Sequence, residues 1–208
     1  MLHPTTTYKM STFDWSEFLA GSSITALVTE GFRYLREKRE KQIDAAASIG
    51  DIAKITKIMR GVVSDTFYDR FMVFAGKDSA GAIVAGKKLF IDSIYEEHGD
   101  EYDAGDLEIK DWQADSHYYQ MFADMLLRGC VELVTSKMPP CKLKSIYEFQ
   151  GVKRSLVFHL ATTKNNAKVF FCSVATTREK EIIAEDKARI DSAIDQLRGI
   201  FEKWKKFH

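Results

Sequence analysis

The chain has 208 residues and a mass of 23.7 kDa, enough for one domain with a sizeable core and an added segment, but short for two full domains. Its 30 basic residues (Lys and Arg) equal its 30 acidic residues, which argues against a general nucleic-acid binder, because attraction to phosphate needs a positive field. Apolar residues make up 45% and charged residues 29%, so wholesale disorder is excluded.

An amphipathic helix is predicted near the N-terminus, beginning at Ser11 or Asp14 and running to about Ala47. The apolar stretch from Phe18 to Val28 holds only 11 residues without a charge, whereas roughly 20 are needed to span a bilayer, so a transmembrane helix is not expected. The apolar residues of this helix recur at spacings of three and four: Trp15, Phe18, Leu19, Ile24, Leu27, Val28 and Phe32. Its second half is basic, with Arg33, Arg36, Lys38 and Arg39.

This helix allows two interpretations. An apolar helical stripe commonly packs against protein, which favours pairing of chains into a homo-oligomer or docking onto a protein partner. Alternatively, the helix lies on an anionic membrane surface, where its Arg and Lys side chains meet the lipid head groups. We expect residues 1–50 to form this association or membrane-surface segment, with a hinge at Ala45–Gly50, and residues 51–208 to form a separate folded domain.

A second helix is predicted to start with Asp51 as its N-cap, followed by a strand at Arg70–Ala75. The apolar stripe of this helix is Ile52, Ile55, Met59, Val62, Val63 and Phe67. The glycine-rich segment Gly76–Gly86 then predicts a turn or wide loop before a strand at Lys88–Glu96. It is not a phosphate-binding loop, because Lys88 stands where the motif needs Ser or Thr.

The segment Glu96–Asp115 holds nine acidic residues against one lysine and lacks the spacing of a calcium loop, so it is interpreted as a solvated acidic loop. Helical periodicity returns from Asp115 to about Gly129. A short strand at Cys130–Ser136 and a short helix or turn at Leu143–Phe149 follow, separated by a loop at Pro139–Pro140.

The strongest β signal is a hairpin of Val152–Ala161 and Lys168–Ala175 around a polar loop. Leu156, Phe158 and Leu160 share one face of its first strand, and Ser155, Val157 and His159 share the other. A long amphipathic helix is predicted from Thr177 or Arg178 to Phe207.

No residue pattern carries a known catalytic chemistry, so we expect no enzyme activity and no cofactor. The cysteines, Cys130, Cys141 and Cys172, form an odd set without C-x-x-C spacing, which predicts neither a disulfide framework nor a metal site. A reducing cytoplasm fits this cysteine usage, with attachment at the inner membrane face as the alternative location. Asp14 and Glu17 interrupt the first apolar stretch, so a secretory signal is not expected.

Several local matches make the chain resemble the GAF domain family, relatives of PAS domains. They are Ile55–Ser64 running into Asp69–Phe74, Leu127–Val134 with its central glycine, Gly151–Leu160, and Lys168–Ala175. The resemblance covers about Asp51 to Phe207. It implies an α+β fold, in which a central antiparallel sheet of about five to six strands is backed by N- and C-terminal helices.

The resemblance also implies regulation or binding more often than catalysis. The Asn-Lys-Phe-Asp-Glu set of cyclic-nucleotide-binding members is absent, and the context of Cys141, MPPCKLK, is not a recognisable bilin site. If helices cover the Leu156, Phe158 and Leu160 face, then Val157 and His159 look toward the face where such folds hold their pocket. Ligand-pocket candidates are therefore His159 and Val157, with His117, Tyr118 and Tyr119 as a covering lid.

The leading interpretation is a non-enzymatic regulatory or interaction protein that acts through self-association or a protein partner. Two alternatives remain: a peripheral membrane protein anchored by its N-terminal helix, and a small-molecule sensor.

Overall fold

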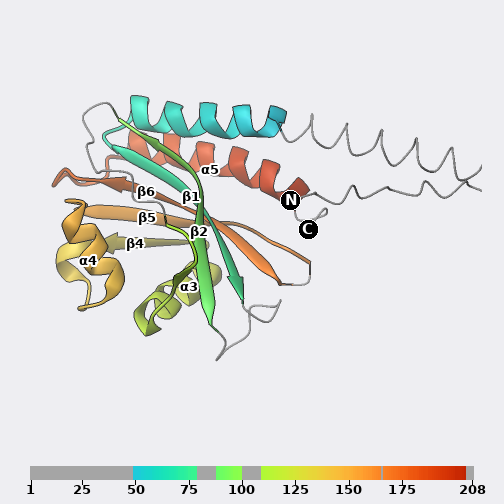
Figure 1. Ribbon diagram of the computed structural model, residues 1–208. Helices are drawn as coiled ribbons and strands as arrows, with labels where there is room; N and C mark the ends of the chain where they lie inside the picture. The colour runs from blue at the N-terminus through green and yellow to red at the C-terminus, as the bar shows by residue number, and fades with distance from the viewer. Residues whose placement is uncertain (1–48, 79–87, 100–108, 165, 205–208) are drawn as a thin grey trace, which may run out of the picture. The chain divides into compact units, whose positions relative to one another are not determined.

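A six-stranded antiparallel sheet with the strand order β3-β2-β1-β6-β5-β4 lies at the centre of the fold (Figure 1). The computed structural model describes residues 49–78, 88–99, 109–164 and 166–204. The strands are β1 (Arg70–Asp78), β2 (Leu89–His98), β3 (Trp112–Gln113), β4 (Cys130–Val134), β5 (Arg154–Thr162) and β6 (Lys168–Thr176). The predicted N-terminal helix lies outside the described residues. Apart from Ile49 and Gly50, all described residues belong to one compact unit, Asp51–His208.

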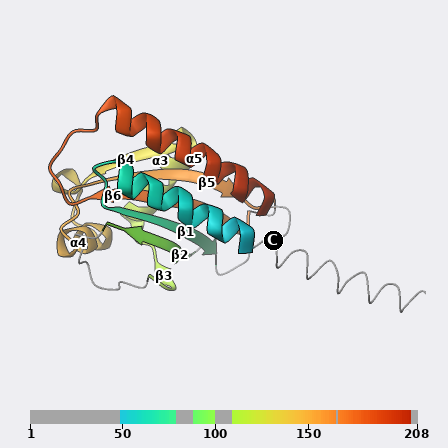
Figure 2. The same cartoon turned by 90° about the horizontal axis from the view of Figure 1, so that it is seen from above.

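Helices cover both faces of this sheet. The helix of residues 49–65 and α5 (Ala184–Trp204) lie side by side on one face, and α3 (Ser116–Arg128) and α4 (Lys142–Phe149) lie on the other (Figures 1 and 2). A single 3₁₀ turn, η1 (Thr135–Lys137), follows β4. The helix 49–65 and α5 are antiparallel, because Trp204 Nε1 donates to Asp51 Oδ2 at 3.1 Å and Arg189 donates to the Asp65 carbonyl at 2.9 Å. We call these two helices the helix pair.

One core fills the space between the sheet and the helix pair. Leu156, Phe158 and Leu160 lie in it, as the strand periodicity predicted. The helix pair supplies residues that are less than 2% exposed, among them Ile55 and Leu197. The rings of Phe170, Phe201 and Trp204 close the end of this core, with centroids 4.9 to 6.4 Å apart.

A second core lies between the sheet and α3. Successive side chains of a strand point to opposite faces, so Val157, Val169 and Phe171 face away from the helix pair and toward α3. From α3, Phe122 and Met125 pack against them. The sheet is therefore buried on both faces, which explains why β6 is buried at every position except its first.

The ends of α3 lie where the helical periodicity predicted them. Asp115 is the N-cap, and its side chain accepts a hydrogen bond from the Tyr118 N–H at 2.9 Å. Gly129 follows the last helical residue with φ of 76°, a left-handed conformation that glycine adopts without steric cost. Its N–H donates to the Met125 carbonyl.

Three sequence predictions about element boundaries are wrong. The terminal helix starts at Ala184, not at Thr177 or Arg178, because the Thr177 N–H and hydroxyl donate to the Asp69 carboxylate and hold this segment against β1. Asp51 is not an N-cap, since residues 49 and 50 are already helical and its carboxylate accepts from Trp204. The two-residue strand β3, within the predicted acidic loop, has no periodicity that a sequence could reveal.

Candidate functional site

The face of the sheet that carries α3 and α4 contains a small cavity of about 40 Å³. Its walls come from β1, β2, β5, β6, α3, α4 and the residues around β3. A volume of this size holds one or two water-sized groups, whereas pockets for drug-sized ligands measure roughly 300–1,000 Å³.

Large side chains fill the space around this cavity. Phe74 stacks on Phe171 with ring centroids 5.0 Å apart, and Phe122 meets Phe171 edge-on at 5.6 Å. Trp112 and Tyr118 form a second edge-on pair at 4.8 Å. Offset and edge-on ring pairs of this kind add to the stability that burial provides. The cavity is therefore the remainder of a packed core.

One end of the cavity is polar. Arg70 is 3% exposed; its Nε donates to Glu96 at 2.7 Å, and one of its terminal nitrogens donates to the Gln150 side-chain oxygen at 2.6 Å. Ser155 and Ser173 exchange a 2.7 Å hydrogen bond between their hydroxyls. A charged group this deeply buried is stable only with such partners, and Glu96 supplies the compensating charge.

The orientation of the Gln150 amide follows from Arg70. Arginine has donors and no acceptor, so the amide oxygen of Gln150 must face Arg70 and the amide nitrogen must face away. Gln150 is 8% exposed and lines the cavity, and its nitrogen has no hydrogen-bond partner among the described residues. A residue that lines the cavity therefore carries a buried N–H donor without a partner among the described residues.

The structure separates the five predicted pocket residues. Val157 and Tyr118 line the cavity, and Tyr118 is 5% exposed. His159, His117 and Tyr119 do not line it. The hydroxyl of Tyr119 accepts a hydrogen bond from the Leu89 N–H, and His117 is exposed on the first turn of α3. Of the predicted lid, only Tyr118 lies over the cavity.

His159 is held at a bulge in β5, where the pairing with β6 shifts between His159 and Ala161. Its Nε2 lies 2.9 Å from the Thr162 hydroxyl, and its carbonyl accepts from Arg198 of α5 at 3.1 Å. Partial burial, followed by the nearby Arg198 charge, lowers the pKa of the imidazole below its usual value of about 6.5. No described carboxylate or thiol is paired with the imidazole by a hydrogen bond.

The thiols of Cys172 and Cys130 offer little nucleophilic character. Cys172 is fully buried, and burial raises its pKa far above the usual value for a thiol. Burial also raises the pKa of Cys130 to about 11. Reactive cysteines have a lowered pKa, so both side chains behave as small apolar groups. Within the described ranges, no group of three or more His, Cys, Asp or Glu side chains could hold a metal ion.

A second concave feature, a groove, runs along the outer surface of the helix pair. It is open to solvent and encloses about 1180 Å³. The groove residues come from both helices: Lys54, Lys57, Ile58, Gly61, Val62 and Asp65 from the first, and Glu185, Ala188, Arg189, Ser192, Ala193, Gln196, Gly199, Ile200 and Lys203 from α5. Short side chains predominate at its centre, so the two helices do not fill the surface between them.

Two of the groove residues are glycines in helix interiors. A Cβ placed on Gly61 or Gly199 would meet no atom within 4 Å, and neither residue has a positive φ. An interior glycine destabilises a helix by about 0.5–1 kcal/mol relative to alanine. The two glycines therefore lower the stability of the helix pair without relieving any contact among the described residues. Glycines inside helical periodicity are the sequence signal that could have pointed to this surface.

The residues of the predicted N-terminal association helix, Trp15 to Phe32, and its basic membrane-surface candidates, Arg33 to Arg39, lie outside the described residues. Both interpretations stay predictions. In the described part of the chain, no helix has the length and apolar character needed to cross a bilayer.

No family model matches the sequence, and no curated protein matches it. Solved structures match its fold. The GAF domain of a two-component sensor histidine kinase from Bacillus halodurans is 14% identical, with a TM-score of 0.50 over 73% of this chain and 96% of that chain. The GAF domain region of a putative membrane protein from Geobacter sulfurreducens PCA is 11% identical, with a TM-score of 0.53 over 76% of this chain and 97% of that chain.

A third solved structure has a similar fold. The GAF3 domain of a Synechocystis sp. PCC6803 protein, in its photoproduct state, is 10% identical, with a TM-score of 0.52 over 76% of this chain and 96% of that chain. At this level of identity, these matches bear on the fold alone. The chain has a GAF-like fold, and the resemblance drawn from its sequence is confirmed at that level.

Proposed function

We propose that this chain is a non-enzymatic regulatory or interaction protein, whose GAF-like domain acts through self-association or a protein partner. The observation that carries the proposal is the contrast between its two concave features. The interior cavity is almost filled, and the groove on the helix pair is open.

The filled cavity weighs against a role that needs a large ligand. A bilin or a cyclic nucleotide has many times the volume of one or two water molecules, so either would require the displacement of buried aromatic rings. Those rings are mutually packed, and Phe171 is 1% exposed. Interiors packed at this density resist such displacement.

The groove supports association, because its open centre and charged ends offer both shape and charge to a partner. Native mass spectrometry and sedimentation velocity on the purified full chain test the proposal. We expect a stable oligomer or a stoichiometric protein complex. A monomer without a bound protein at every soluble concentration would remove it.

Small-molecule sensing is the second candidate function, and the buried Gln150 nitrogen favours it. The Gln150→Glu variant keeps an oxygen toward Arg70 but loses the unpaired donor, which makes it a near-isosteric test. A ligand that acts through this site should raise the melting temperature of the wild type and not that of Gln150→Glu in a thermal-shift screen. The exposed Gln196→Glu variant on α5 is the matched control. If no compound separates Gln150→Glu from that control, Gln150 is no ligand contact.

A further inference from the structure

We propose that residues 109–114, which we call the strap, form a gate to the interior cavity, and that Lys77 latches this gate shut. The proposal rests on the second candidate function, small-molecule sensing, and adds the route by which a molecule reaches the cavity. A space of about 40 Å³ accepts a molecule larger than one or two waters only if part of its wall moves. The strap is the part of the wall with the weakest attachment.

The strap contributes Ile109 and Trp112 to the wall of the cavity. Its strand, β3, is two residues long, whereas the other wall strands, β1, β2, β5 and β6, are nine or ten residues long, and the wall helices α3 and α4 have 13 and 8 residues. β3 also stands at one end of the strand order, so β2 is its one partner among the described strands. A short edge segment of this kind opens at a lower free energy than the long strands beside it.

Side chains hold the strap to β2 where the backbone pairing is interrupted. The Ser93 N–H donates to the Ile109 carbonyl at 2.7 Å. Asp111 then has φ of 48°, a left-handed conformation that is uncommon for residues other than glycine. Its N–H donates to Asp92 Oδ1, a side-chain atom of β2, at 2.6 Å. The strap therefore depends on side-chain charges at Asp111.

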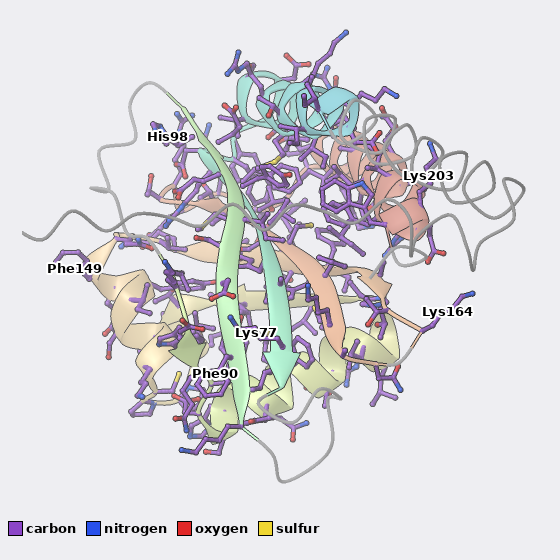
Figure 3. The ribbon with its side chains drawn as sticks, turned by 45° about the vertical axis from the view of Figure 1, so that its right-hand side comes forward. Lys77, Phe90, His98, Phe149, Lys164 and Lys203 are labelled. Carbon is purple, nitrogen blue, oxygen red and sulfur yellow. The ribbon has the colours of Figure 1, made fainter. Side chains whose placement is uncertain are left out.

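Lys77 of β1 supplies the opposite charge at this point. Its Nζ lies 2.7 Å from Asp92 Oδ2 and 2.8 Å from Asp111 Oδ1, so one ammonium joins β1, β2 and the strap (Figure 3). Hydrogen bonds to Asp111, and then to Asp92, raise the pKa of Lys77, so the ammonium stays charged. Without it, the two carboxylates repel each other across the contact that closes the strap. The Lys77 side chain is 39% exposed, so solvent screens these ion pairs and the latch can open.

The far end of the strap is anchored independently of Lys77. Asp115 follows the strap, and its carboxylate accepts hydrogen bonds from the Tyr118 N–H of α3 at 2.9 Å and from the Lys142 N–H of α4 at 3.0 Å. Trp112 contacts the Tyr118 ring edge-on at 4.8 Å, and both side chains line the cavity. Opening at the latch therefore moves Ile109 and Trp112 away from the cavity while Asp115 keeps α3 and α4 in place.

Hydrogen exchange on the full chain tests the latch. The Ser93 N–H bonds to the strap, and the Ala114 N–H bonds to the Leu89 carbonyl of β2 at 2.9 Å. In the wild type, both amides should exchange faster than that of Phe171 in the central strand β6. Their exchange should also be insensitive to low urea concentrations, because a local opening exposes little surface. If both instead match Phe171 in rate and in urea dependence, the strap opens only when the whole domain unfolds, and the proposal is wrong.

The Lys77→Met variant keeps the side-chain stem and removes the charge. It should speed the exchange of the Ser93 and Ala114 amides at least about fivefold, since two partly exposed ion pairs are lost and two carboxylates are left together. Lys187→Met is the matched control, because Lys187 forms an exposed 2.9 Å ion pair with Asp191 on α5, which stays intact when the strap opens. It should leave both amides unchanged. Equal effects of the two variants would show that Lys77 is no latch.

Thiol labelling tests whether the strap is the route to the cavity. Met121 lines the cavity and is 7% exposed, so Met121→Cys places a thiol in its wall. Methyl methanethiosulfonate is a small probe of access to this thiol, and peptide mass spectrometry follows each cysteine separately. The introduced thiol should react faster than Cys172, which is fully buried in the other core. Adding Lys77→Met should speed its labelling about fivefold, as for the strap amides, and adding Lys187→Met should not. Unchanged labelling beside faster amide exchange would show that molecules enter elsewhere.

The failure of this inference differs from the failure of small-molecule sensing. Exchange and labelling need no ligand, so they support the gate even if a thermal-shift screen finds no compound. A compound whose effect depends on Gln150, together with labelling that Lys77→Met does not change, would keep the sensor and remove the gate.

Discussion

The two faces of the central sheet are covered in different ways. On the α3 and α4 face, aromatic and methionine side chains converge and leave only a small cavity with one polar end. On the other face, the helix pair seals an apolar core beneath it but leaves its own outer surface grooved. Figure 3 shows how densely side chains occupy the interior. A GAF-like domain can therefore fill its interior while an outer surface stays open to solvent.

The largest expected effect tests the sealed core under the helix pair. Phe201 is fully buried between Phe170 and Trp204. Phe201→Ala should lower the free energy of unfolding by about 3–5 kcal/mol, through lost burial and the cavity left behind. Urea unfolding measures this change. Phe149→Ala is the control, because Phe149 is 80% exposed and projects from the end of α4; it should change stability by no more than about 0.5 kcal/mol (Figure 3).

A smaller effect is expected on the α3 face, where a cavity already exists. Met121 is 7% exposed and lines that cavity. Met121→Ala should lower the free energy of unfolding by about 2–3 kcal/mol and enlarge the cavity enough to admit a small apolar molecule. Benzene or xenon should therefore raise the melting temperature of the variant more than that of the wild type. Equal shifts in melting temperature would mean that the side chains on the α3 face collapse into the space left by Met121.

The hydrogen bonds that hold the segment between β6 and α5 should contribute less to the stability of the domain than either core. The Asp69 carboxylate accepts hydrogen bonds from the Thr177 N–H at 3.0 Å and from its hydroxyl at 2.7 Å. Asp69→Ala should lower the free energy of unfolding by about 1–3 kcal/mol, because a partly buried N–H and hydroxyl of Thr177 lose a charged acceptor. Hydrogen exchange should show faster opening of residues 177–183. Unchanged protection there would show that this segment is held by other contacts.

The smallest expected effect is a pH dependence at His159. Its pKa is lowered in the folded state, so the unfolded chain binds a proton more readily as the pH falls below about 6.5. The stability that the neutral imidazole contributes is fully present above that pH. It is lost as the pH falls toward the lower pKa that His159 has in the folded protein. The His159→Gln variant should lose less stability than the wild type over this interval, measured by urea unfolding on either side of pH 6.5. Identical losses would contradict the assignment.

Strong local signals explain what the sequence could predict. The two-residue period of Leu156, Phe158 and Leu160 identified the face that meets the helix pair, and Asp115 and Gly129 marked the ends of α3 correctly. Each of these signals depends on neighbours in the chain. The start of α5 was wrong because the competing partner of Thr177 is Asp69, which lies 108 residues earlier.

The candidate site was harder to predict for the same reason. Val157 was placed on the cavity face by alternation, but His159 sits at a bulge that alternation cannot detect. Arg70 and Gln150 meet across 80 residues and belong to no motif, so only the folded chain brings them together. The acidic segment was expected to be wholly a loop, yet Trp112 within it pairs with Ile91 of β2 and lines the cavity.

The position of β1 beside β6 has a consequence for how the domain forms. Phe74 of β1 pairs with Phe171 of β6, so the centre of the sheet joins segments about 100 residues apart, while the hairpin of β5 and β6 closes locally. Contacts between distant segments slow folding, because a long loop must close before they form. On the ribosome, β1 and β2 would emerge well before the strand that completes them, and the central ladder could assemble only after most of the chain had been made.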